Sequence, residues 1–306
     1  MEENIEEKEN IQVLKRDFEN FLFRKVELDF GLFHPYISEA IKSSVLSSGK
    51  RIRPIITILI SFLLGIGKKK AFDIAYSVEL SHAFTLVHDD IIDKPKERRG
   101  EPPLFQRFGQ EISLLIGDLL MNYSFIPIFS SPQAVKFFVY YMGAVIEGQI
   151  LDVMWSQKKL DLSQNLQDIV LQIQTKKTAS LFKISCVLPL YFSDKKILRK
   201  KEFRKRIENS LNSFALHFGI SFQILDDISD VKEDELSGAP NILYTLGKEK
   251  TLSLLRKEIK LANYYLEDFL KVVKKISSRS YEKNSKLLKF LIGEILNYEK
   301  ALQNLS

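Results

Sequence analysis

The chain has 306 residues, 45% of them apolar and 27% charged, a composition that supports a sizeable buried core and excludes a disordered or largely membrane-embedded chain. The 45 Lys and Arg against 39 Asp and Glu give a net charge of +6 that is spread along the sequence, so charge does not indicate nucleic-acid binding. The single cysteine, Cys186, excludes an intramolecular disulfide and argues against a cysteine-based zinc site.

The predicted elements are all helices. Apolar residues recur at helical spacing, two-residue alternation is missing, and only 13 Gly and 9 Pro interrupt the chain. In chain order, helices are predicted over residues 10–32, 35–48, 54–66, 69–94, 111–128, 132–158, 162–191, 197–232 and 250–304, the last broken near 277. We therefore predict one all-α domain over residues 1–306, with residues 1–10 as a flexible polar N-terminus.

The N-terminal sequence MEENIEEKEN is acidic and lacks the basic start and apolar block of a signal peptide. The longest apolar stretch, residues 54–66, is shorter than the roughly 20 residues that a membrane-spanning helix needs. We therefore expect a cytoplasmic protein without stable membrane insertion.

Two acidic clusters each end a strongly apolar predicted helix. The first contains Asp89, Asp90 and Asp93, and the second contains Asp226, Asp227 and Asp230. Carboxylates four residues apart share one helix face and repel each other, and at the end of a buried helix they are costly unless paired or bound to a cation. One such cluster is as well explained by a solvated helix end, but two copies favour hard divalent cations. Oxygen-only ligands favour Mg²⁺, which usually shares its shell with water and substrate phosphates.

Three basic clusters accompany the acidic ones. They are Gly49–Pro54 (GKRIRP), Arg98–Gly100 (RRG) and Lys176–Thr178 (KKT). Arginine captures phosphate through two parallel hydrogen bonds, and lysine acts as a point charge. Each cluster alone is more often a solvated surface patch, but their occurrence beside the acidic pairs favours a site for phosphate-bearing substrates.

In this order, the motifs resemble those of the trans-isoprenyl (polyprenyl) diphosphate synthases. The resemblance covers about residues 50–247. It rests on GKRIRP (49–54), HAFTLVHDDIIDKPKERRG (82–100), GD (117–118), GQILD (148–152), KT (177–178) and FQILDDISD (222–230).

The resemblance implies an all-α helical bundle around a central cavity, the isoprenoid synthase fold, in a homodimer. It also implies a Mg²⁺-dependent prenyltransferase that condenses isopentenyl diphosphate with an allylic diphosphate, with three Mg²⁺ ions when substrate is bound. An allylic cation forms as diphosphate leaves, the double bond of isopentenyl diphosphate attacks it, and a proton is lost.

The resemblance also assigns roles to individual residues. The implied Mg²⁺ ligands are Asp89, Asp93 and Asp226, supported by Asp90, Asp227 and Asp230. The implied contacts of isopentenyl diphosphate are Lys50, Arg53, His82 and Arg99. The implied contacts of the allylic substrate are Arg98, Lys177, Thr178 and Gln223. Asp152 would orient its neighbours at the metal site. Without the resemblance, His82 is better explained as a buried histidine in a helix bundle.

The segment 231–247 (VKEDELSGAPNILYTLG) departs from the family pattern. It is shortened, and Ala239 or a neighbour stands where the family usually has a lysine. Lys232 or Lys248 could substitute for it. This departure concerns one contact to the allylic diphosphate and the closing of the loop, and it leaves the acidic motifs intact.

Product length follows from the helix that carries the first acidic cluster. At a rise of 1.5 Å per residue, Phe84 and Thr85 lie about 6–8 Å before Asp89. A bulky ring at Phe84 should form the floor of the cavity. A phenylalanine here is equally consistent with an ordinary residue of the hydrophobic core. In the family a large residue here accompanies short products, so we predict a C15 to C20 product.

Three other functions share some of these sequence features. A class I terpene synthase usually carries a longer Asn/Ser/Glu pattern at the second acidic motif and does not need the GKRxRP and RRG groups. An HD-type phosphohydrolase needs several histidines on different helices and would leave the second acidic cluster unexplained. A non-catalytic partner subunit of a prenyl diphosphate synthase typically lacks aspartates from one motif; the atypical segment after Asp230 keeps this alternative open.

Overall fold

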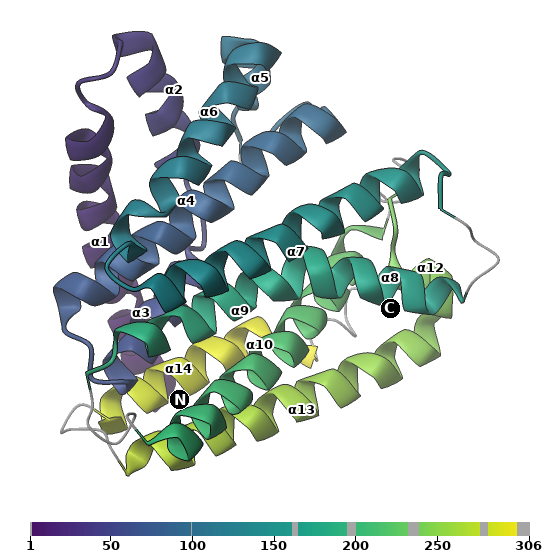
Figure 1. Cartoon of the computed structure of the whole chain (residues 1–306). Coiled ribbons are helices and arrows are strands. Elements are labelled where there is room, and N and C mark those ends of the chain that lie inside the picture. The colour runs from purple at the N-terminus through teal and green to yellow at the C-terminus, as the bar shows by residue number, and fades with distance from the viewer. Residues whose placement is uncertain are drawn as a thin grey trace. The chain divides into compact units, whose positions relative to one another are not determined.

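Helices make up every regular element in the part of the chain that the computed structural model describes. The described residues are 2–98, 100–160, 165–194, 200–231, 239–275 and 281–298, without the side chains of 2–4. The elements are α1 (Glu2–Phe30), α2 (Pro35–Val45), α3 (Ile52–Leu63), α4 (Lys68–Asp93), α5 (Leu104–Phe108), α6 (Gln110–Ser124), η1 (Ile126–Ile128), α7 (Pro132–Ser156), α8 (Leu166–Gln174), η2 (Thr175–Ala179), α9 (Ser180–Val187), η3 (Leu188–Phe192), α10 (Lys201–Ser229), α12 (Ile242–Leu246), α13 (Lys248–Lys274) and α14 (Tyr281–Ile295) (Figure 1). The predicted all-α fold is confirmed.

Contacts divide the chain into two units, residues 1–62 with 66–135 and residues 63–65 with 136–306. In the first unit α4 packs along α6, and α1, α2 and α5 also contact α4 (Figure 1). Its largest fully buried side chains include Phe18, Phe30 and Tyr76. The prediction of one domain over residues 1–306 stays a prediction.

In the second unit the long helix α10 packs along α13, and α9 and η2 contact α10 (Figure 1). The apolar positions of α10 recur at helical spacing, and Phe214 and Phe218 are fully buried together with Phe182 of α9. These rings pack the middle of α10 against α9, and the acidic residues follow at the C-terminal end of α10.

The helix limits differ most from the predicted ones in three places. Residues 2–10, predicted as a flexible N-terminus, continue α1, in keeping with the high helix propensity of Glu and Lys. The short helices α5 and α12 lie between predicted helices, in the stretches 95–110 and 233–249, because five residues are too few to show periodicity. The predicted helix 162–191 is divided into α8, the π-helix η2, α9 and the 3₁₀-helix η3.

Two helical stretches, residues 110–128 and 132–156, are long and apolar enough to cross a membrane by length and composition alone. The core helices of soluble proteins pass the same test, so the finding is weak evidence for a span. Several of their large apolar side chains are exposed: Leu115 on α6, Phe129 after η1, and Tyr140 and Ile150 on α7. These side chains are available for association with another protein surface.

Candidate active site

The first acidic cluster lies at the C-terminal end of α4. Asp90 is only 5% exposed, and its carboxylate accepts a hydrogen bond of 2.5 Å from Nε of Arg98. Asp89 is half-buried and Asp93 is exposed. Lys94 ends the helix in a left-handed conformation, and its N–H donates to the carbonyl of Asp90 at 3.0 Å. Asp90 therefore holds the turn that follows α4, while Asp89 and Asp93 are more open to solvent.

The second acidic cluster lies at the C-terminal end of α10. Asp227 is 3% exposed, and its carboxylate accepts hydrogen bonds from Nε2 of Gln174 (2.8 Å), Nε2 of Gln223 (2.9 Å) and the backbone N–H of Ile242 (2.9 Å). Asp226 is half-buried and Asp230 is exposed. In both clusters the middle aspartate is therefore a buried acceptor, and the two outer ones are the more exposed pair.

The outer aspartates fit Mg²⁺ by their chemistry. Each cluster offers two carboxylates one helical turn apart, and carboxylate oxygens are the ligands that Mg²⁺ prefers. Among the described residues, no group of three or more His, Cys, Asp or Glu side chains is placed to hold a metal ion. The shell would then be completed by water and substrate phosphate, as Mg²⁺ usually requires. The assignment of Asp89, Asp93 and Asp226 as ligands stays a prediction.

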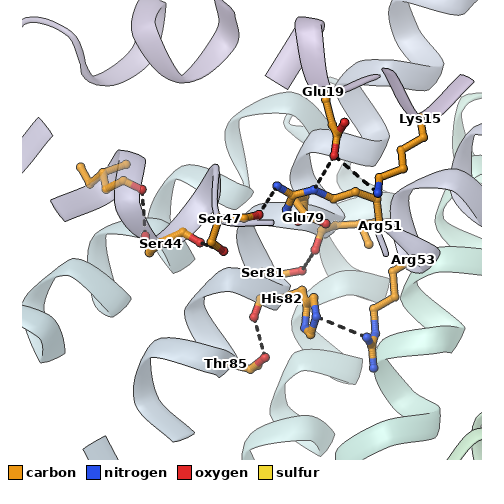
Figure 2. A network of polar contacts seen from close by, with 12 residues as sticks. Lys15, Glu19, Ser44, Ser47, Arg51, Arg53, Glu79, Ser81, His82 and Thr85 are labelled. Carbon is orange, nitrogen blue, oxygen red and sulfur yellow. Dashed lines mark hydrogen bonds and ion pairs between the residues drawn. The ribbon is translucent and has the colours of Figure 1, made fainter. Parts of the chain in front are cut away.

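The basic residues around the start of α3 differ in burial. Lys50 is exposed and Arg53 half-buried, whereas Arg51 between them is buried. Nη1 of Arg53 lies 3.4 Å from Nε2 of His82 on α4. The backbone carbonyl oxygen of His82 accepts a hydrogen bond from Oγ1 of Thr85 (Figure 2). The structure thus brings Arg53 and His82 together within the first unit, as a shared anion site requires.

Lys177 and Thr178 lie on the π-helix η2, a geometry that is frequent at functional sites. Nζ of Lys177 lies 2.6 Å from Oδ2 of Asp152, and Oγ1 of Thr178 donates to Oε1 of Gln223 at 2.6 Å. Because Gln223 also donates to Asp227, one hydrogen-bonded path joins Thr178 to the second acidic cluster.

Two glycines explain the close packing around η2. A Cβ on Gly148 of α7 would collide with the backbone of Lys177, and a Cβ on Gly219 of α10 would lie 2.6 Å from Cα of Ala179. Since only glycine permits these approaches, α7 and α10 fit against the π-helix at these two positions. The sequence indicated Gly148 as part of a motif but gave no signal for Gly219.

Phe84 is buried on α4 and contacts His88, with 4.8 Å between ring centroids. Nε2 of His88 lies 3.1 Å from the carbonyl oxygen of Leu114 and 3.7 Å from Oδ1 of Asp118 on α6. Gly117 of the same helix has no room for a Cβ, which would collide with the His88 ring. The GD pair at 117–118 therefore holds His88, which in turn contacts the predicted floor residue Phe84.

The remaining predicted site residues are Arg98, Arg99, Lys232 and Lys248. Arg99 and Lys232 lie outside the described residues. Lys248 is the first residue of α13, and Arg98 lines a cavity of about 410 Å³ in the first unit. Sequence reasoning did not select Gln174, Asn241, Arg51 or Glu79, which the structure places in buried polar contacts.

Comparison with known proteins gives consistent results. A family model described as "Polyprenyl synthetase" matches residues 34–242. The chain is 30% identical over 240 residues to an all-trans-nonaprenyl-diphosphate synthase (geranyl-diphosphate specific) of Rhodobacter capsulatus, covering 74% of this chain and 70% of the relative. It is 32% identical over 198 residues to a geranylgeranyl diphosphate synthase of Saccharolobus solfataricus, covering 62% and 56% of the two chains. The crystal structure of a geranyltranstransferase from Thermotoga maritima is similar, with a TM-score of 0.73 and 25% identity over 95% of this chain and 99% of that one.

Proposed function

Because the chain belongs to the polyprenyl synthetase family, we propose that it condenses isopentenyl diphosphate with an allylic diphosphate to give a short-chain trans-prenyl diphosphate. The bond from the allylic carbon to diphosphate breaks, the double bond of isopentenyl diphosphate bonds to that carbon, and a proton leaves. The observation that carries the proposal is the matching burial of the two acidic clusters, each with a buried central aspartate and two more exposed outer ones.

The outer aspartates Asp89, Asp93 and Asp226 are proposed to hold Mg²⁺ ions. Bound there, the metal would neutralise charge on the departing diphosphate. The buried partners Asp90 and Asp227 keep the outer carboxylates in place through their own hydrogen bonds. The burial of Asp90 and Asp227 supports their sequence-based role, whereas Asp230, assigned there to the same supporting group, is exposed.

Lys177 and Thr178 are proposed to bind the diphosphate group of the allylic substrate. The Asp152 carboxylate holds the ammonium group of Lys177, and Gln223 holds the hydroxyl of Thr178. Since both side chains are oriented before substrate arrives, less ordering is needed in the transition state. Lys50, Arg53 and His82 in the first unit are proposed to bind the diphosphate of the second substrate.

The product is proposed to be C15 to C20. The names of the similar proteins do not decide the length, since they include both a nonaprenyl and a geranylgeranyl diphosphate synthase. The argument rests on Phe84, whose ring is buried and contacts His88.

A homodimer is proposed as the working assembly. Large exposed apolar side chains on α6 and on α7, such as Leu115 and Tyr140, support it because homodimer interfaces are more apolar than the remaining protein surface. Size-exclusion chromatography with light scattering tests the assembly.

The function is tested with purified protein, Mg²⁺, isopentenyl diphosphate and C5, C10 or C15 allylic diphosphates. We expect condensation and products of C15 to C20, read by mass spectrometry. Asp89→Asn and Asp226→Asn should lose turnover while circular dichroism stays unchanged. Absence of condensation with every allylic substrate would contradict the proposal.

A further inference from the structure

Arg51 is the middle cation of the segment 49–54, and it points inward. It is 7% exposed, whereas Lys50 is exposed and Arg53 half-buried. Its backbone φ of 52° lies in the left-handed region, which is uncommon for a residue with a side chain. This conformation costs free energy that the contacts of the residue can offset.

The guanidinium of Arg51 reaches three elements. Nη1 donates to Oε1 of Glu79 on α4, Nη2 donates to the carbonyl oxygen of Ser47 at 2.6 Å, and Nε lies 3.7 Å from Oε1 of Glu19 on α1 (Figure 2). Glu79 is itself 4% exposed. A buried pair of opposite charges with this geometry depends on both partners, because either one alone would leave an uncompensated charge.

The pair connects the two elements that carry the predicted contacts of one diphosphate. The carbonyl of Arg51 accepts the N–H of Ile55 at 3.1 Å, so its turn also starts α3, on which Arg53 lies. Glu79 lies three residues before His82 on the same helix, α4. The separation of Arg53 and His82 therefore depends on the contact between Arg51 and Glu79.

We propose that Arg51 and Glu79 form a buried positioning pair that sets the geometry of Lys50, Arg53 and His82 for the diphosphate of isopentenyl diphosphate. Arg51 does not touch this substrate; it fixes the backbone that presents its neighbours. The inference rests on the proposed function for the identity of the substrate, and it concerns residues to which no role in binding was assigned from the sequence.

The first test is Glu79→Gln, which keeps the size of the side chain and removes its charge. We expect KM for isopentenyl diphosphate to rise by about tenfold and KM for the allylic substrate to stay within about twofold. The matched control is Glu27→Gln, which removes the partner of Lys42 (2.6 Å) elsewhere in the first unit and should change neither KM. Thermal unfolding measures how much of each variant is folded.

The second test is Arg51→Gly, which distinguishes the effect of the backbone conformation from that of the side-chain charge. Glycine adopts a positive φ without strain, so this variant keeps the turn accessible but loses the guanidinium. A selective rise in KM for isopentenyl diphosphate, as with Glu79→Gln, supports the proposal. Loss of stability with both KM values unchanged in the folded fraction would show a merely structural pair and overturn it.

Binding of isopentenyl diphosphate, measured by calorimetry in parallel, separates this inference from the proposed function. Wild-type protein that binds this substrate but does not condense it contradicts the proposed function alone; weaker binding by Glu79→Gln would still support the positioning pair. Equal binding by wild type and Glu79→Gln overturns the pair. Wild type that does not bind it overturns both.

Discussion

Gln174, the last residue of α8, donates a hydrogen bond of 2.8 Å to the carboxylate of Asp227, 53 residues later in the chain. The carboxylate also accepts the N–H of Ile242, and Nδ2 of Asn241 donates to the carbonyl of Asp227 at 2.8 Å. Asp227 thereby joins the end of α10 both to the segment before the π-helix and to the start of α12.

Asp227→Asn should therefore destabilise the protein. The amide presents N–H groups where the native carboxylate only accepts, so at least one buried donor loses its partner at a cost of about 1–3 kcal/mol. Denaturant unfolding measures this cost. Asp230→Asn, at an exposed position of the same cluster, should stay within about 0.5 kcal/mol of wild type. Equal stability of the two variants would refute the role of Asp227.

Gly117→Ala should displace His88. The new methyl group would collide with the imidazole ring, so we expect a loss of about 1–3 kcal/mol from overpacking. The matched control is Gly143→Ala on α7, where a Cβ meets nothing within 4 Å. This change should stabilise the helix by about 0.5–1 kcal/mol. Destabilisation of similar size in both variants would contradict the packing argument.

Phe84→Ala should lengthen the product by one or more five-carbon units, because the ring proposed to form the floor of the cavity is removed. Mass spectrometry of the products gives the answer. Removing a buried ring costs about 3–5 kcal/mol, so Phe84→Leu serves as a milder second variant with a smaller shift. If both variants are folded and keep the wild-type product, Phe84 does not form the floor.

Chelation by EDTA should abolish turnover without unfolding the protein. Because the outer aspartates form pairs and leave most of a metal shell open, Mg²⁺ alone should raise Tm little, whereas Mg²⁺ with inorganic diphosphate should raise it clearly. Thermal unfolding under the two conditions checks this. A full shift with Mg²⁺ alone would indicate a preformed metal site that needs no phosphate.

The sequence was sufficient for the all-helical fold and for most helix limits, because apolar periodicity over ten or more residues is a strong signal. It did not predict the π-helix, since the polar and small residues Thr175–Ala179 carry no apolar periodicity that could show an extra residue in the turn. The structure places Gly148 and Gly219, both distant in sequence, against that turn.

The orientation of the basic residues could not be predicted from the sequence either. Lys50, Arg51 and Arg53 are equivalent as charges in a motif, and the inward direction of Arg51 depends on Glu79, 28 residues away. Burial of Asp90 and Asp227 could not be read from spacing either, since each depends on partners outside its own cluster.

The π-helix also bears on what a deletion in this part of the chain would change. The N–H of Ser180 donates to the carbonyl of Thr175, five residues earlier, so the turn contains one residue more than an α-helix would. Removing one of these residues should close the turn to an ordinary α-helical one, with α8 and α9 keeping nearly the same rotation about their common axis. The contact of Gln174 with Asp227 should then remain, while the wide turn that carries Lys177 and Thr178 is lost. A one-residue gap here is therefore expected to alter the presentation of these two side chains more than the fold.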